Sequence, residues 1–234
     1  MLEEQRIHVN GNEFFKGVKD CIPTLFGYLS IGFACGVVSK SCGMTVLETV
    51  AMSTFIYAGS SQFIAASMIL SSASVTQTIL TVFLVNLRHL LMSAAIAPYF
   101  KDNSLKKNFT VGVLMTDETF ALASSEGSSK SNISYKWMIG VNITAYLNWI
   151  AATFVGACFS SLIYDYKKFG LDFALPAMFI GLLVSSLKDN SEAKKSAVVV
   201  VSSAMVFIAT VKIFFCKYGN SNISSDWSCY RRYY

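Results

Sequence analysis

This sequence of 234 residues is poor in charge: acidic and basic residues make up 14% of it, and histidine occurs only twice. A soluble domain carries about 25% charged residues, because water must solvate its surface. Here 53% of the residues are hydrophobic, and they form long blocks. The shortage of charge therefore excludes a soluble globular domain, and most of the surface is expected to face lipid.

Several patterns typical of enzymes and metal proteins are also missing. The six cysteines are scattered without a CxxC pair, which argues against a metal or disulfide framework. No HExxH or GxSxG motif occurs, so we expect no enzyme activity, no cofactor and no metal. The net charge of +5 comes mainly from lysines in short loops, which is typical of membrane topology and not of nucleic-acid binding. The first residues lack the pattern of a cleaved signal peptide.

Hydrophobic blocks that approach the length of a bilayer span, about 20 residues, recur along the chain. The fold class predicted from them is all-α: a polytopic transmembrane helix bundle with about six to eight membrane segments, including broken or re-entrant helices. We expect a cytoplasmic N-terminal segment at 1–20, an integral membrane transport domain at 21–216 and a polar C-terminal tail at 217–234. The seven blocks are 24–39, 45–70, 75–100, 109–124, 135–164, 171–187 and 197–216.

Small residues interrupt the block 45–70 near its middle. Glycine lowers helix stability and serine diverts backbone hydrogen bonds, so a break is predicted over Ala58, Gly59, Ser60, Ser61 and Gln62. Non-helical backbone inside a membrane lies in protein or lines a wet cavity, and in transporters it faces the substrate. The alternative is a packing face on a continuous helix. If the block enters and leaves on one side, the basic residues outside the spans divide eleven to six, with the N-terminus inside.

Glycines also mark the first block. Gly32 and Gly36 form a GxxxG stripe, which lets two helices approach closely. The partner helix belongs either to this chain or to a separate subunit.

Ionisable groups stand where lipid is expected. Asn86, Arg88 and His89 lie in the middle of block 75–100, where an arginine costs about 3 kcal/mol to insert. The helical neighbours of Arg88 on its own face are apolar, so its counter-charge must come from another helix. Asp117 and Glu118 lie within the block 109–124 and are the candidates. One is expected to pair with Arg88. The other either faces a cavity, where it binds a substrate ammonium or a proton, or lies at a water-exposed helix end.

At these residues the sequence resembles the AzlC-type large subunit of branched-chain amino-acid exporters, a bacterial and archaeal family. The resemblance covers roughly residues 14–120, about half of the chain. Later segments fit more loosely, and the polar residues after Lys217 depart from the apolar end that is common in the family. The matching stretches, in order, are PTLFGYLSIGFACGVVS, MSTFIYAGSSQFIAASMI, FLVNLRHLLMSAAIAPYF and LMTDETFAL.

The resemblance implies a multi-pass protein of the cell membrane of a bacterium or archaeon. It also implies export of leucine, isoleucine, valine and their analogues, with a small AzlD-type membrane subunit as partner. A role in substrate binding follows from the chemistry of the polar groups: donors for the carboxylate, acceptors for the ammonium. The candidate substrate-binding residues are Gly59, Ser60, Ser61, Gln62, Asn86, Arg88, His89, Asp117 and Glu118.

Three other functions share some of these features. Charged and broken helices also build ion or solute channels. An intramembrane hydrolase would need a dyad of Ser60 or Ser61 with His89, without any of the usual motifs. A non-transporting membrane scaffold has no use for charges as costly as Arg88 and Asp117. Transport is therefore the favoured function.

Overall fold

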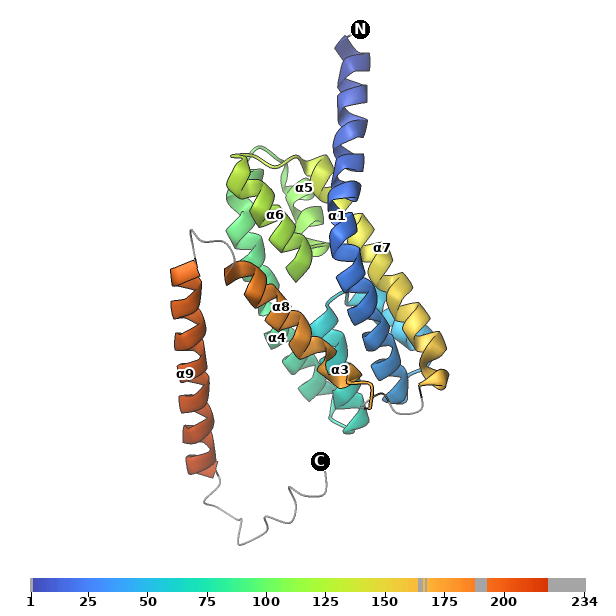
Figure 1. Cartoon of the computed structure of the whole chain (residues 1–234), viewed down its shortest axis with the longest axis vertical. Coiled ribbons are helices and arrows are strands. Elements are labelled where there is room, and N and C mark those ends of the chain that lie inside the picture. Colours follow the sequence, from blue (N-terminus) through green and yellow to red (C-terminus); the bar gives the residue numbers. More distant parts are fainter. Residues whose placement is uncertain (1, 164–165, 167, 188–192, 219–234) are drawn as a thin grey trace. The chain divides into compact units, whose positions relative to one another are not determined.

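The computed structural model describes residues 2–163, 166, 168–187 and 193–218. In this part of the chain all regular elements are helical, so the predicted all-α class is confirmed (Figure 1). The α-helices are α1 (Leu2–Ser41), α2 (Val46–Phe55), α3 (Gly59–Leu70), α4 (Val75–Ile96), α5 (Leu105–Val113), α6 (Asp117–Ser129), α7 (Tyr135–Phe159), α8 (Ala174–Leu187) and α9 (Ala193–Tyr218). The shorter 3-10 helices are η1 (Ala97–Phe100), η2 (Ser160–Leu162) and η3 (Leu171–Phe173).

Three of these helices are long and apolar enough to cross a bilayer. The spans are Glu13–Ser41 in α1, Val75–Phe100 in α4 with η1, and Tyr135–Leu162 in α7 with η2. Helix α1 begins well before the predicted block 24–39, because the polar N-terminal segment continues it without a break. The bundle is thus built on three through-going helices, with shorter helices between them.

Helices α1 and α7 pack against each other along their length and run in the same direction (Figure 1). The indole of Trp137 donates to Asp20 over 2.8 Å near the start of both helices. Near their ends a Cβ at Gly36 would overlap the carbonyl of Thr153, and a Cβ at Gly32 would meet α7 as well. The GxxxG stripe of the sequence therefore serves a contact within this chain.

The block 45–70 folds into a hairpin of two half-length helices, α2 and α3. The side-chain amide of Gln62 donates to the carbonyl of Met52 over 3.2 Å, and the hydroxyl of Ser53 donates to the amide oxygen of Gln62 over 3.4 Å. In a continuous helix residues ten apart are about 15 Å apart, so the chain must turn back. The break lies at 56–58, and the predicted break residues from Gly59 onward form the first turn of α3.

A second hairpin is formed by α5 and α6, where the sequence predicted the single block 109–124. The amide of Ile133 donates to the carbonyl of Tyr99 over 3.0 Å, and Asn132 donates to Asp102 over 2.8 Å. These bonds place the end of α6 beside the end of α4, where α5 begins. The chain therefore enters and leaves on the same side, with its turn at 114–116.

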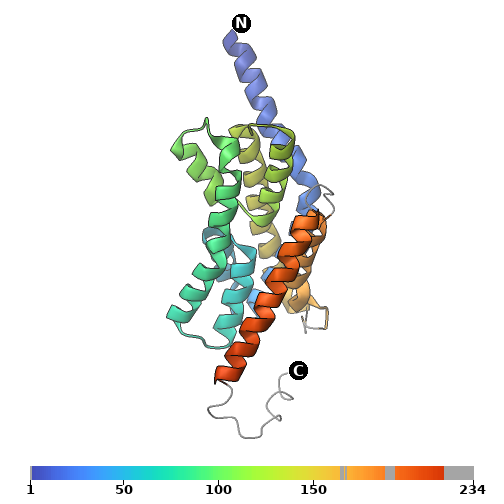
Figure 2. The same ribbon diagram turned by 90° about the vertical axis from the view of Figure 1, so that its left-hand side faces the viewer.

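The two hairpins enter the bundle from opposite sides. We call the side where the span of α1 begins the first side, and the side where α1 ends the second side. The turn between α3 and α4 lies on the second side, while α5 and α6 lie toward the first (Figures 1 and 2). The first side holds most lysines of these elements: Lys16, Lys19, Lys101, Lys106, Lys107, Lys130 and Lys136, against Lys40 on the second.

The chain divides into two compact units, 1–179 and 180–234. The second unit contains the end of α8 and the helix α9, whose segment Val198–Lys212 is apolar. Most of its apolar side chains are exposed, as expected for side chains that meet lipid; they include Val198, Val199, Val201, Met205, Val206 and Phe207. Of the predicted polar tail at 217–234, residues 219–234 lie outside the described residues.

Candidate functional site

The tip of the first hairpin brings an uncapped helix start into the middle of the bundle. Tyr57 adopts a φ of 41°, which a bulky residue rarely does, and Ala58 is extended, so α3 begins abruptly at Gly59. A Cβ at Gly59 would lie 2.9 Å from the ring of Trp149, so only glycine lets α7 approach this closely. Because Ala58 offers no side-chain cap, the first N–H groups of α3 have no capping acceptor among the described residues.

The tip of the second hairpin brings a capped and acidic helix start to the same place. The hydroxyl of Thr116 accepts a hydrogen bond from the amide of Thr119, and the side chain of Thr119 accepts one from the amide of Thr116. Asp117 and Glu118 form the first turn of α6, where the helix dipole stabilises negative charge. The two acidic residues therefore begin a helix, and do not lie inside one as the sequence block suggested.

Arg88 joins the two tips. Its Nη2 donates to the hydroxyl of Ser60 on α3 over 2.9 Å and lies 2.8 Å from Oδ2 of Asp117 on α6. The guanidinium also lies over the ring of Phe179 on α8, 5.3 Å from its centroid. The expected counter-charge on another helix is confirmed, and it is Asp117. One side chain of α4 thus holds the starts of both half-helices.

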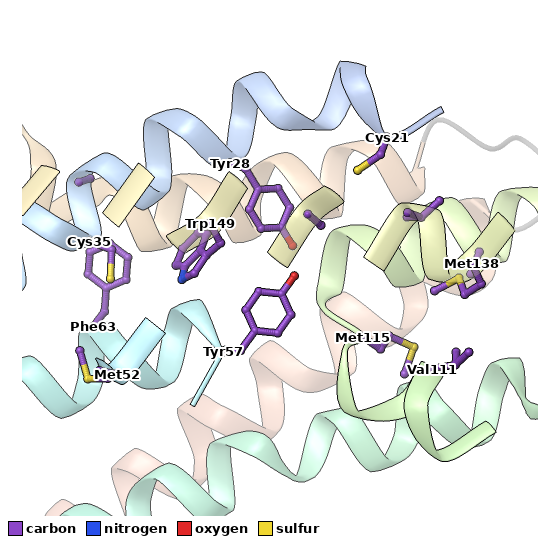
Figure 3. Close-up of a cluster of buried hydrophobic side chains, with 14 of the residues drawn as sticks. Cys21, Tyr28, Cys35, Met52, Tyr57, Phe63, Val111, Met115, Met138 and Trp149 are labelled. Carbon is purple, nitrogen blue, oxygen red and sulfur yellow. The ribbon is translucent and has the colours of Figure 1, made fainter. Parts of the chain in front are cut away.

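Tyr28 of α1 supplies a second connection to the tip of α6. Its hydroxyl donates to Oε2 of Glu118 over 2.8 Å and also contacts the hydroxyl of Thr116. The ring of Tyr28 meets the ring of Trp149 edge to face, with centroids 5.5 Å apart. In Figure 3 the hydroxyls of Tyr28 and Tyr57 point toward each other between the two hairpin tips.

A pocket lies where these groups meet. Its free volume is about 10 Å³, which is room for about one water molecule. Three buried polar atoms of its lining have no hydrogen-bond partner in the described part of the chain: the hydroxyl of Tyr57, Nε of Arg88 and Nε2 of His89. Buried polar groups are otherwise almost always paired, so these three atoms can donate to or accept from a bound molecule. The lining residues are Tyr28, Tyr57, Ala58, Gly59, Arg88, His89, Thr116, Asp117, Glu118, Trp149 and Met178.

The pocket lies at mid-depth of the bundle. Tyr28, Arg88 and Trp149 each fall near the centre of their span, in α1, α4 and α7 respectively. Transporters commonly bind their substrates at this depth, between the starts of broken helices. The arrangement offers donors on the α3 side and carboxylates on the α6 side, so it suits a ligand with one negative and one positive end.

Five of the nine predicted binding residues line the pocket: Gly59, Arg88, His89, Asp117 and Glu118. The other four lie just behind it. Ser60 accepts from Arg88, and Ser61 donates to the amide oxygen of Asn86 over 2.6 Å, so these two contacts fix α3 to α4. His89 lines the same pocket as Arg88, although helical spacing directs the two side chains apart.

Gln62 was predicted to bind substrate, but its hydrogen bonds connect helices behind the pocket. It is fully buried, and its amide oxygen accepts from the indole of Trp149 over 3.0 Å, besides Ser53 and the thiol of Cys35. Its amide nitrogen is engaged by the carbonyl of Met52. The hydrogen bonds of Gln62 therefore brace α2, α3 and α7 against one another, and none of them faces the pocket.

Four polar or aromatic lining residues were not predicted from the sequence: Tyr28, Tyr57, Thr116 and Trp149. Thr116 had a signal, since a threonine followed by two acidic residues is typical of a helix start. Tyr57 directly precedes the small residues of the break. No sequence signal identified Tyr28 and Trp149, because a tyrosine or tryptophan in an apolar span gives the same sequence pattern whether it faces lipid or a cavity.

Comparison with known proteins decides the family. A sequence profile described as AzlC protein matches residues 23–163, well over half of the chain. The chain belongs to the AzlC family. The inner membrane protein YgaZ of Escherichia coli is 29% identical over 206 residues, which cover 86% of this chain and 82% of that protein. No solved structure matches the chain.

Two further relatives come from other organisms. The branched-chain amino acid transport protein AzlC of Bacillus subtilis is 29% identical over 164 residues, covering 70% of this chain and 63% of that protein. A membrane protein of Archaeoglobus fulgidus is 30% identical over 177 residues, covering 75% of this chain and 76% of that protein. The resemblance noted in the sequence is confirmed, and the family is one of transport proteins.

Proposed function

We propose that this AzlC-family protein exports leucine, isoleucine, valine and their analogues across the cell membrane of a bacterium or archaeon. It would act as a multi-pass large subunit together with a small AzlD-type membrane subunit. The observation that carries this proposal is the meeting of two oppositely inserted half-helices around Arg88 and Asp117 at mid-depth. Such charges are costly inside a membrane unless a polar substrate passes between them.

The backbone end of an amino acid fits the division of charge between the tips. We expect the substrate carboxylate to bind the uncapped N–H groups at Gly59 and the free Nε of Arg88. Helix starts favour anions, and guanidinium groups bind carboxylates with directed hydrogen bonds. The substrate ammonium would then lie toward the carboxylates at the start of α6, and an apolar side chain would contact Trp149 and Met178.

A cavity with room for one water molecule does not admit an amino acid, so transport requires the tips to separate. Because each hairpin enters from one side only, the withdrawal of one hairpin opens the pocket to that side alone. Alternate withdrawal of α2–α3 and α5–α6 would carry the substrate across without an open pore. The excess of lysine on the first side supports a cytoplasmic position for it, since cytoplasmic loops are enriched in lysine and arginine.

Efflux of labelled leucine, isoleucine and valine from preloaded cells tests the proposal. Cells that express the chain with its small partner should export these three faster than cells with an empty vector, and lysine should not be exported. The Arg88→Gln variant should export at the empty-vector rate. Lys107→Gln should export normally, because Lys107 lies on α5 outside the pocket, over the ring of Tyr135 at the start of α7. Equal efflux with and without the chain would contradict the function.

A further inference from the structure

The two carboxylates at the start of α6 have different surroundings. Asp117 forms an ion pair with Arg88, and its side chain is 16% exposed. Glu118 has no cation within ion-pair distance among the described residues, and its oxygen accepts a hydrogen bond from Tyr28. A carboxylate at mid-depth without a cation is costly. Glu118 therefore lacks a positive partner that Asp117 already has.

A tyrosine hydroxyl near Glu118 is also unsatisfied. Tyr57 is 6% exposed, and its hydroxyl lines the pocket without a hydrogen-bond partner in the described chain. The ring is held by an edge-to-face contact with Tyr146, with centroids 4.7 Å apart, and by the strained backbone at the hairpin tip. The hydroxyl is thus fixed in position, points toward Tyr28 (Figure 3), and is available to accept a hydrogen bond from a ligand.

We propose that Glu118, Tyr28 and Tyr57 form an ammonium-binding subsite, which makes a free amino group a requirement for recognition by this protein. This inference rests on the proposed function and adds the part of the substrate that the protein reads on the α6 side. An ammonium group donates three hydrogen bonds. The carboxylate of Glu118 and the hydroxyl oxygen of Tyr57 are acceptors for two of them, and the positive charge neutralises Glu118.

The chemistry of the subsite suits an organic ammonium better than a metal ion. Hard divalent cations require six or more oxygen ligands in close geometry, whereas the pocket offers one carboxylate without a cation, Glu118, the Arg88-paired carboxylate of Asp117 and a few hydroxyls. The walls are the rings of Tyr28, Tyr57 and Trp149, which favour an alkylammonium through cation–π attraction. A substrate that carries a carboxylate but no amino group would leave Glu118 without a positive partner, and its binding should be weaker.

Binding to the purified full chain, reconstituted in lipid nanodiscs, tests this inference by calorimetry. Three probes are compared: leucine, 4-methylpentanoate, which lacks the amino group, and 3-methylbutylamine, which lacks the carboxylate. Wild type should bind leucine at least about tenfold more tightly than 4-methylpentanoate, since a hydrogen bond to a charged group is worth about 1.5–3 kcal/mol. Glu118→Gln should bring this ratio close to one and abolish binding of the amine.

Matched variants separate recognition from structural damage. Tyr57→Phe should weaken leucine binding about three- to tenfold while binding of 4-methylpentanoate stays the same. Glu126→Gln changes another glutamate of α6, which pairs with Lys130 at the surface, and should leave all three affinities unchanged. Tyr146→Phe removes a hydroxyl that donates to the carbonyl of Thr54 and should also leave the ratio unchanged.

The outcomes distinguish this inference from the proposed function. If leucine is exported but the leucine preference survives both Glu118→Gln and Tyr57→Phe, the subsite is wrong and the function stands. If leucine is not exported but wild type binds 3-methylbutylamine and Glu118→Gln does not, the subsite stands and the function is wrong. A wild-type chain that binds neither leucine nor the amine overturns the subsite, as does a Glu126→Gln variant that loses the preference equally.

Discussion

The two hairpins occupy equivalent positions on opposite sides of the bundle, yet their tips are chemically opposite. Helix α3 starts from Ala58 without a side-chain cap and carries no acidic residue in its first turn. Helix α6 starts from Thr116 with a capping box and two acidic residues. The same backbone device thus leaves free donors on one side of the pocket and places carboxylates on the other.

This difference shows how a helical bundle can create a polarised site from two helix starts. A helix start is electropositive by itself, because its first N–H groups are unpaired. The acidic residues and the cap make the start of α6 electronegative. Arg88 adds positive charge at the start of α3 and connects the two tips. Substitutions at one tip can therefore be compared with matched substitutions elsewhere in the bundle.

The largest effect is expected from Asp117→Asn, which removes the acidic partner of Arg88. Breaking a buried ion pair costs about 3 kcal/mol or more, because the remaining charge is left unpaired. We expect a clear loss of folded protein in the membrane and leucine efflux at background. In the double variant Arg88→Gln/Asp117→Asn, thermal unfolding of the purified protein should recover toward wild type, while efflux should stay absent. Full recovery of efflux would show that the pair is only structural.

The next effect concerns the close contact of α3 with α7. In Gly59→Ala the added Cβ would lie 2.9 Å from the ring of Trp149, so the tip must shift. Overpacking of this kind costs about 1–3 kcal/mol, and the efflux rate should fall with the melting temperature. Gly27→Ala is the control, because nothing lies within 4 Å of a Cβ there. Equal melting temperatures for the two variants would contradict the contact.

The sequence predicted those parts of the site that single residues or short segments reveal, and not those that depend on contacts between separate helices. Charges inside apolar blocks identified Arg88, His89, Asp117 and Glu118, because an ionisable group in lipid is costly wherever the helix points. The break near Gly59 was located to within a few residues. The sequence did not determine whether the chain continues across the membrane after the break or turns back, because a broken span and a hairpin have the same composition.

The second hairpin shows which information the sequence lacks, namely the contacts between helices that are far apart in the chain. Block 109–124 is apolar enough for one helix, and only the contacts of Ile133 and Asn132 with the end of α4 reveal that the chain turns back. The pairing of Arg88 with Asp117, and the pocket position of Tyr28 and Trp149, depend on the same long-range packing. Sequence spacing alone carries no information about which faces of separate helices meet.

A smaller effect, on stability more than on binding, is expected from Gln62→Leu. This change removes the hydrogen bonds with Trp149, Ser53 and the carbonyl of Met52, and so leaves buried polar groups unpaired. The expected cost is about 1–3 kcal/mol of stability. The half-saturating leucine concentration should change less than about threefold, because Gln62 lies behind the pocket. An unchanged melting temperature with a large loss of leucine affinity would instead make Gln62 a binding residue.

The smallest change makes the two tips alike. Ala58→Ser supplies α3 with the side-chain cap that Thr116 gives to α6, and a good N-cap stabilises a helix by about 1 kcal/mol. The new hydroxyl would occupy N–H groups that we assign to the substrate carboxylate, so the protein should melt higher and bind leucine several-fold more weakly. Ser74→Ala, which removes the cap of α4 at the membrane surface, should lower stability without changing affinity. Unaltered leucine affinity in Ala58→Ser would mean that the carboxylate binds elsewhere, because no substrate can use donors that the chain already satisfies.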